Sequence, residues 1–211
     1  MPADVRRAER RLLLLDAAFD LLGTEGWAGT TVRAVCQRAE LNPRYFYESF
    51  DDLDALVVAV YDRIIEKLTE SVERAQAAAA DEPAAQVRAA VEAIVAFVDD
   101  DRRRARVLYV EALGNEALNR RRRATGHALV SAVEEHAAAS SRGLPPGEQA
   151  GRLGAAMLVG GLSELLVEWL DGRITVSREE LIEDATTVVL ALGEATAALA
   201  AGRRKHRRRS R

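Results

Sequence analysis

The sequence predicts an all-α protein, and three observations support that prediction. Apolar residues recur at spacings of three and four along most of the 211-residue chain, which is the period of a buried helix face. The chain is rich in Ala, Leu, Glu and Arg, which favour helices, and only 5% of its residues are aromatic. No segment has the alternating pattern that is typical of a half-buried strand.

Three short helices are expected at the N-terminus. The first carries an apolar face that includes Leu22 and ends at Gly23. A second follows Thr31, whose hydroxyl group is of the type that caps helix N-termini. A third begins at Asn42 and Pro43, because Asn is a good N-cap and Pro fits the first helical position.

Longer helices are expected in the rest of the chain. Acidic residues at 51–52 cap a fourth helix, whose apolar stripe runs from 53 to 68. Further helices are predicted near residues 87–98, 102–113, 116–140, 148–171 and 178–202. We place a domain boundary near residue 55, which gives an N-terminal domain over 1–55 and a helical bundle over 56–202. A basic tail over 203–211 is expected to be disordered.

Charge and cysteine content restrict the class of protein. The net charge is −3, although seven of the 30 basic residues lie in the last nine positions. Overall charge therefore gives no support for nucleic-acid binding, and that case depends on a local motif. The single cysteine, Cys36, excludes an internal disulfide and fits a reducing cytoplasm. The longest apolar run, 153–162, is too short to span a bilayer, so we expect no membrane association.

Residues 30–56 have the organisation of a helix-turn-helix, which needs two short helices joined by a tight turn. Small and apolar residues can form the inner faces of the two helices: Val32, Val35, Cys36, Ala39 and Leu41. Phe46 and Phe50, four residues apart, are expected to hold the second helix to the core. That arrangement leaves polar residues on outer or flanking surfaces: Arg44, Tyr45, Tyr47, Glu48 and Ser49.

This motif resembles the tetracycline-repressor (TetR) family of bacterial regulators. The resemblance covers about the first quarter of the chain and rests on Gly26, Thr30, Thr31, Val32, Ala39, Leu41, Tyr47, Phe50 and Leu56. It implies a three-helix domain that binds double-stranded DNA, followed by a helical domain for ligand binding and dimerisation. Three positions depart from the family pattern: Glu40 replaces a turn glycine, Leu53 a lysine and Ser49 a histidine.

The resemblance also implies roles for individual residues. Tyr47 matches a tyrosine whose hydroxyl contacts a phosphate, and Arg44 and Tyr45 occupy positions that face bases. Arginine suits the N7 and O6 acceptors of guanine. Thr31, Arg33 and Asn42 are expected to contact the DNA backbone. The alternative is that the two tyrosines are core residues and Arg44 is a solvated charge.

A repressor of this family would be released from a palindromic operator by a small-molecule effector. Candidate lining residues are Tyr61, Ile65, Phe97, Tyr109, Glu111, Met157 and Trp169. For each of them, a position in the ordinary core is the favoured interpretation. Glu111 could meet a cationic ligand or pair with one of the arginines at 102–106. A constitutive regulator without a ligand is the alternative function.

Other classes receive less support from the sequence. An enzyme is disfavoured because His127 and His136 are nine residues apart and do not share a helix face, and Cys36 has no evident partner base. We therefore expect no catalytic residue, metal or cofactor. The basic tail is the best feature of a membrane-surface protein. Because the helix near 148–171 is apolar on nearly every side, we instead predict a homodimer through the last two helices.

Overall fold

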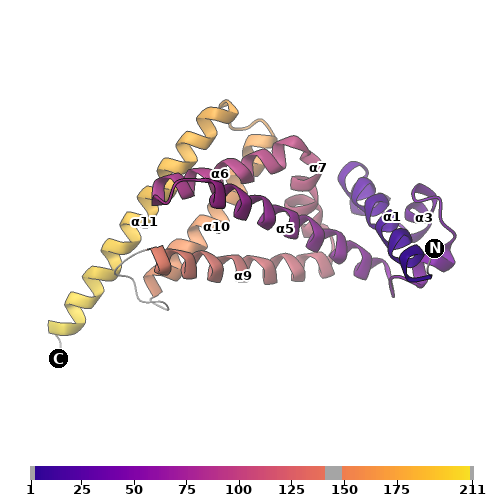
Figure 1. Cartoon of the computed structure of the whole chain (residues 1–211), viewed down its shortest axis with the longest axis horizontal. Helices are drawn as coiled ribbons and strands as arrows, with labels where there is room; N and C mark the ends of the chain where they lie inside the picture. Colours follow the sequence, from indigo (N-terminus) through magenta and orange to yellow (C-terminus); the bar gives the residue numbers. More distant parts are fainter. Residues whose placement is uncertain (1–2, 141–148, 210–211) are drawn as a thin grey trace. The chain divides into compact units, whose positions relative to one another are not determined.

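The structure is a computed structural model that describes residues 3–140 and 149–209 (Figure 1). Within these residues the chain forms helices joined by turns and contains no strand, which confirms the predicted fold class. The elements are α1 (Ala3–Thr24), α2 (Gly26–Gly29), α3 (Val32–Arg38), α4 (Pro43–Tyr47), α5 (Leu53–Ala78), α6 (Pro83–Asp100), α7 (Arg102–Ala105), η1 (Arg106–Glu111), α8 (Ala112–Gly114), α9 (Glu116–Ser140), α10 (Gln149–Leu170) and α11 (Arg178–Arg209).

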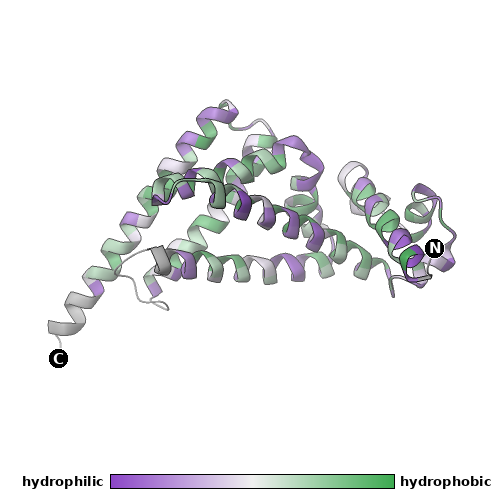
Figure 2. Ribbon diagram, in the orientation of Figure 1, coloured by the Kyte–Doolittle hydropathy of each residue, from purple (hydrophilic) through white to green (hydrophobic). Residues whose placement is uncertain are grey.

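Two compact units divide the chain. The first comprises Met1–Glu70 and Phe97–Arg123, and the second comprises Ser71–Ala96 and Ala124–Arg211. The division of function predicted near residue 55 stays a prediction. Figure 2 shows hydrophobic and hydrophilic residues alternating around the turns of α1 and α5, as expected of helices with one buried face.

The core of the first unit is built from apolar residues of its N-terminal helices. Leu14 and Leu22 of α1, Val35 of α3, Phe46 of α4 and Leu56 of α5 are each 0% exposed. Burying a Leu, Val or Phe side chain contributes roughly 1.5–3 kcal/mol. The short helices are therefore held by tertiary packing, because an isolated helix of five or seven residues is not stable in water.

The predicted helix near 102–113 is interrupted. It forms α7, then one turn of π-helix in η1, then α8. In a π-helix each amide bonds five residues back, so one extra residue is accommodated per turn. Apolar spacing did not predict this turn, since Val107 and Leu108 are buried there as they would be in an α-helix.

Close packing of α10 against α11 organises the second unit. Gly154 lies where a Cβ atom would come within 2.5 Å of the Thr196 hydroxyl oxygen, so the two helices approach closely at this point. The basic tail, predicted to be disordered, continues α11 as helix to Arg209, and residues 210–211 lie outside the described residues. Arg and Lys are strong helix formers, which is consistent with this continuation.

Candidate nucleic-acid interface

Helix α3 begins at the cap that the sequence predicts. The Thr31 side chain accepts a hydrogen bond from the backbone amide of Ala34 at 3.1 Å. The neighbouring Thr30 is buried and donates its hydroxyl hydrogen to the carbonyl of Gly26 at 2.8 Å. The two threonines therefore have different roles: Thr31 caps the start of α3, and Thr30 closes the end of α2.

The turn between α3 and α4 is tight, and it places a non-glycine residue in the left-handed region. Glu40 has φ = 54°. The amide of Leu41 donates to the carbonyl of Cys36 at 2.9 Å and that of Glu40 to Gln37 at 3.2 Å, which is the bonding pattern of a Schellman motif. The glutamate that replaces the family's turn glycine is therefore left-handed, a conformation that costs roughly 1 kcal/mol or more for a non-glycine residue.

Helix α4 is held by its aromatic residues and starts at the predicted cap. The Asn42 side chain accepts a hydrogen bond from the Arg44 amide at 3.0 Å, and Pro43 occupies the first turn. Phe46 is fully buried and Phe50 is 6% exposed, with ring centroids 6.0 Å apart. The predicted anchoring of this helix by the two phenylalanines is confirmed.

The outer surface of this motif carries the residues predicted to contact DNA. Tyr47 is 63% exposed, and the Arg44 side chain is 82% exposed. Thr31, Arg33 and Asn42 are also exposed. Tyr45 is only half-exposed. All six lie in or beside α3 and α4, and their contacts with DNA stay predictions.

Arginines of α1 hold the C-terminal end of α4, an arrangement that was not predicted from the sequence. Arg7 Nη2 donates to the carbonyl of Glu48 at 2.6 Å, and Arg11 Nη1 donates to that of Ser49 at 3.1 Å. These bonds satisfy carbonyls at a helix end, where positive charge is also favoured by the helix dipole. The i, i+4 spacing of the two arginines was the signal that placed them on one helix face.

A third arginine of α1 covers the half-exposed tyrosine. The guanidinium carbon of Arg10 lies 4.4 Å from the centre of the Tyr45 ring, within cation–π range. Arg10 Nη2 is also 3.5 Å from the Glu48 carboxylate. The first helix thus fixes both the end of α4 and one face of its exposed surface.

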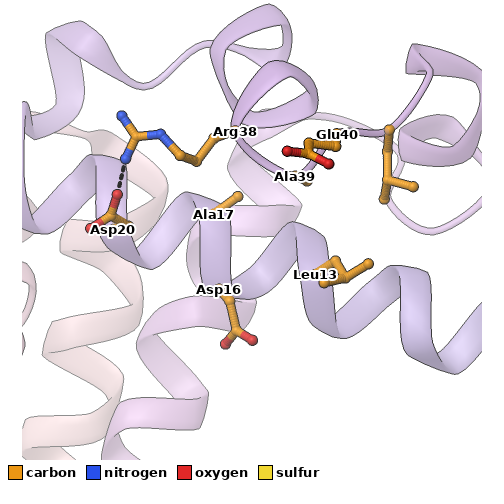
Figure 3. Close-up of a pocket in the computed structure, with 8 residues that line it drawn as sticks. Leu13, Asp16, Ala17, Asp20, Arg38, Ala39 and Glu40 are labelled. Atoms are coloured by element: carbon orange, nitrogen blue, oxygen red, sulfur yellow. Dashed lines mark hydrogen bonds and ion pairs between the residues drawn. The ribbon is translucent and has the colours of Figure 1, made fainter.

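A solvent-open groove lies on another part of the first unit, where α1 passes the turn after α3 (Figure 3). Its volume is about 510 Å³, and its lining residues are Leu13, Asp16, Ala17, Asp20, Arg38, Ala39, Glu40 and Leu41. Arg38 pairs with Asp20 inside it, as Figure 3 shows. This lining includes three carboxylates and none of the predicted DNA contacts, so it does not suit a phosphate backbone.

The residues predicted to line an effector pocket fall into both units. Tyr61 and Phe97 are buried in the first unit, where Ile65 and Tyr109 are partly exposed. In the second unit Met157 is 58% exposed, and Trp169 donates its indole hydrogen to the carbonyl of Val176 at 3.0 Å. The predicted pocket stays a prediction.

Glu111 has protein partners. Its carboxylate lies 2.9 Å from Arg106 Nε and accepts a hydrogen bond from the Trp27 amide at 2.7 Å. These contacts favour the structural alternative for Glu111 over a cationic ligand. Cys36 is packed in the core, where burial raises the pKa of its thiol and keeps it neutral.

Comparison with known proteins agrees with this geometry. Residues 14–60 match the family model described as bacterial regulatory proteins, tetR family. The chain is 36% identical over 93 residues to the HTH-type transcriptional regulator BetI of Burkholderia thailandensis, an alignment covering 44% of this chain and 48% of that protein. BetI of Paraburkholderia xenovorans is 33% identical over the same length. The chain thus matches about half the length of these curated relatives.

Solved structures resemble the whole fold. A TetR-like transcriptional regulator from Rhodococcus sp. RHA1 superposes with a TM-score of 0.66 at 23% identity, covering 94% of this chain and 98% of that one. The fatty acid degradation regulator FadR of Bacillus halodurans gives a TM-score of 0.69 at 14% identity, covering 86% and 94%. Residues 14–60 are thus similar to the tetR family of bacterial regulatory proteins, and the solved structures share the helical fold of the chain.

Proposed function

We propose that this protein is a cytoplasmic transcription regulator that binds a pseudo-palindromic DNA operator as a homodimer. The observation that supports it most strongly is that α4 has one buried face and one exposed polar face. Phe46 is fully buried while Arg44 and Tyr47, on the same five-residue helix, are exposed. A helix anchored on one face and polar on the other is what entry into a major groove requires.

In this proposal the residues take the roles implied by the family. Arg44 and Tyr45 contact base edges, and Tyr47 donates its hydroxyl hydrogen to a phosphate oxygen. Thr31, Arg33 and Asn42 contact the backbone and set the position of the helix. The experiment is selection of double-stranded DNA from a random library by the full chain. We expect a pseudo-palindrome with half-sites about one helical turn apart. Failure to enrich any sequence would contradict the proposal.

The homodimer is supported by apolar side chains that the second unit leaves exposed. Leu153 and Met157 of α10 are 49% and 58% exposed, and Val188 and Leu199 of α11 are 66% and 49% exposed. A second copy of the chain can cover such a face through a two-fold axis. By length and composition α10 and α11 could also cross a membrane, with 17% and 22% of their apolar windows buried. The alternative that these two helices bind a membrane can be tested by measuring binding of the protein to lipid vesicles.

We further propose that a small, largely apolar effector releases the regulator from its operator, which makes it a repressor. Aromatic and aliphatic side chains of the first unit support an apolar site: Tyr61, Ile65, Phe97 and Tyr109. Tyr61 and Ile65 lie on α5, the helix that follows α4 directly. A ligand that moves α5 would move the DNA-contacting helices with it. Because one structural relative is named as a fatty acid degradation regulator, fatty acids are the first probes.

The effector is tested separately from DNA binding. Compounds that raise the melting temperature are identified first, and operator affinity is then measured with and without each one. Ligand and DNA affinities must be reciprocally coupled, typically by about 1–3 kcal/mol. If stabilising compounds leave operator affinity unchanged, constitutive binding becomes the better interpretation, because a ligand that binds both states equally shifts nothing.

A further inference from the structure

One carboxylate lies within reach of two arginines beside the exposed surface of α4. Glu48 follows the last residue of that helix, and its Oε1 atom lies 3.1 Å from Arg44 Nε. Its Oε2 atom lies 3.5 Å from Nη2 of Arg10, the arginine that covers Tyr45. The backbone carbonyl of Glu48 accepts a hydrogen bond from Arg7 at 2.6 Å. Glu48 therefore contacts two arginines of α1, Arg7 and Arg10, and also Arg44, the arginine predicted to contact a base.

The atom of Arg44 that Glu48 engages determines what the arginine has left to offer. A guanidinium group has five hydrogen-bond donors in a fixed plane. Because the Nε hydrogen points to Glu48, both terminal nitrogens are left for other acceptors. Those two nitrogens match the spacing of guanine N7 and O6, whereas an arginine without this restraint can also turn towards a phosphate.

The negative charge of Glu48 also favours specific over non-specific DNA binding. Non-specific DNA binding depends on the number of phosphates that cationic side chains neutralise. A carboxylate 3.1 Å from Arg44 offsets that charge before DNA arrives. Exposed ion pairs between residues four apart contribute little to folding stability, and the Arg44 side chain is 82% exposed. The pair therefore contributes little to folding stability, while a role in recognition fits its position.

We propose that Glu48 is a positioning residue for DNA recognition: it holds Arg44 Nε so that the terminal nitrogens meet guanine, and it weakens binding to random DNA. This inference rests on the proposed function and goes beyond it by assigning specificity to a residue that need not touch a base. The effect can be measured as the ratio of the affinity for the operator to the affinity for a duplex that lacks the guanine.

The test uses the full chain and the operator obtained by selection. Dissociation constants are measured for that operator, for the operator with the guanine at the Arg44 position replaced, and for a random duplex, each over a series of salt concentrations. The variants are Glu48→Ala, Glu48→Gln, Arg44→Ala and the Glu48→Ala, Arg44→Ala pair. Glu40→Gln is the matched control, since it removes one exposed carboxylate from the turn before α4.

We expect Glu48→Ala to lower discrimination for guanine by about tenfold, the size of one good base contact. Glu48→Gln keeps an oxygen acceptor for Nε, so it should keep most of that discrimination. It should also bind random duplex several-fold more tightly, with a salt slope steeper by about 0.9 for one more neutralised phosphate. In the Arg44→Ala background, Glu48→Ala should change discrimination by less than twofold. Glu40→Gln should resemble the parent.

Two outcomes would overturn the inference at different levels. If the unaltered chain enriches no DNA, the proposed function falls and this inference falls with it. If the unaltered chain selects an operator and Glu48→Ala, with an unchanged melting temperature, discriminates guanine as well as the parent does, only the role of Glu48 is overturned. An equal loss in the Arg44→Ala background would also overturn it, because Glu48 would then act without Arg44.

Discussion

Arg106 and Glu111 form an ion pair across a single turn of π-helix, with Arg106 Nε 2.9 Å from the Glu111 carboxylate. The two residues are five positions apart, a spacing that would put them on different sides of an α-helix. In η1 they meet, and both face the end of α1: Arg106 Nη1 donates to the carbonyl of Thr24 at 2.9 Å. Glu111 accepts the amide hydrogen of Trp27 in α2.

This relationship predicts a loss of stability when Glu111 is replaced. Glu111→Ala removes the acceptor of the Trp27 amide and of Arg106 Nε, while Arg106 Nη1 keeps its bond to the Thr24 carbonyl. The Glu111 side chain is only 11% exposed. Loss of a hydrogen-bonded charge at such a site costs about 1–3 kcal/mol. We expect the melting temperature to fall by several degrees, measured by calorimetry at one protein concentration. Glu116→Ala, at an 87% exposed carboxylate, is the control and should shift it little.

Asp101, a second carboxylate in this region, is expected to make the folding stability depend on pH. Hydrogen bonds from Arg103 lower the pKa of Asp101, and the two side chains are joined at 2.9 Å and 2.8 Å. Because the folded pKa is below the unfolded one, the stabilisation is complete above the unfolded value of about 4 and is lost as pH falls through the folded pKa. The interaction therefore stabilises the protein at neutral pH and not in strong acid.

The measurement is urea unfolding of the parent and Asp101→Asn at a series of pH values. We expect the variant to be less stable at pH 7, with the difference shrinking as pH falls below about 4. Asp51→Asn, at an exposed carboxylate, should track the parent throughout, because Asp52 is the residue that accepts the hydrogen bond from the Ala55 amide at the start of α5. A difference between Asp101→Asn and the parent that does not change with pH would contradict the assignment.

The sequence predicted the local features of the helix-turn-helix motif well, because caps and turns depend on neighbouring residues. Thr31 and Asn42 cap their helices as expected, and Glu40 is left-handed where the family has glycine. It did not predict the bonds from Arg7 and Arg11 to α4, since these join residues 41 and 38 positions apart. Contacts at that separation depend on how helices pack.

The π-turn and the surroundings of the candidate effector residues were also hard to predict from the sequence, because both depend on how helices pack. An inserted residue in a helix changes apolar spacing by one position, which short buried stretches such as Val107–Leu108 do not reveal. The exposure of Met157 also followed from tertiary packing, because α10 has apolar residues on nearly every side and the pattern could not indicate which side stays uncovered. Sequence periodicity predicted these helices but not their partners.

Tyr47 provides a prediction about the proposed DNA interface that does not depend on base sequence. It is 63% exposed beside the buried Phe46, and their rings meet edge to face at 5.2 Å. Tyr47→Phe keeps the ring and removes the hydroxyl group. We expect binding to operator and to random duplex to weaken by a similar factor, with little change in salt slope because no charge is lost. Equal affinity of Tyr47→Phe and the parent for both duplexes would show that this hydroxyl makes no phosphate contact.

The exposed apolar face of α10 and α11 gives the last prediction. We expect light scattering to report a dimer at micromolar concentration, and the Met157→Asp, Val188→Asp pair to report a monomer, because each copy would then bury two carboxylates against the other. Leu113→Asp is the matched control: Leu113 is 62% exposed but lies in the first unit. A monomeric parent would contradict the dimer. A parent that binds lipid vesicles through this face, and whose binding is abolished by the pair, would instead assign the face to a membrane surface.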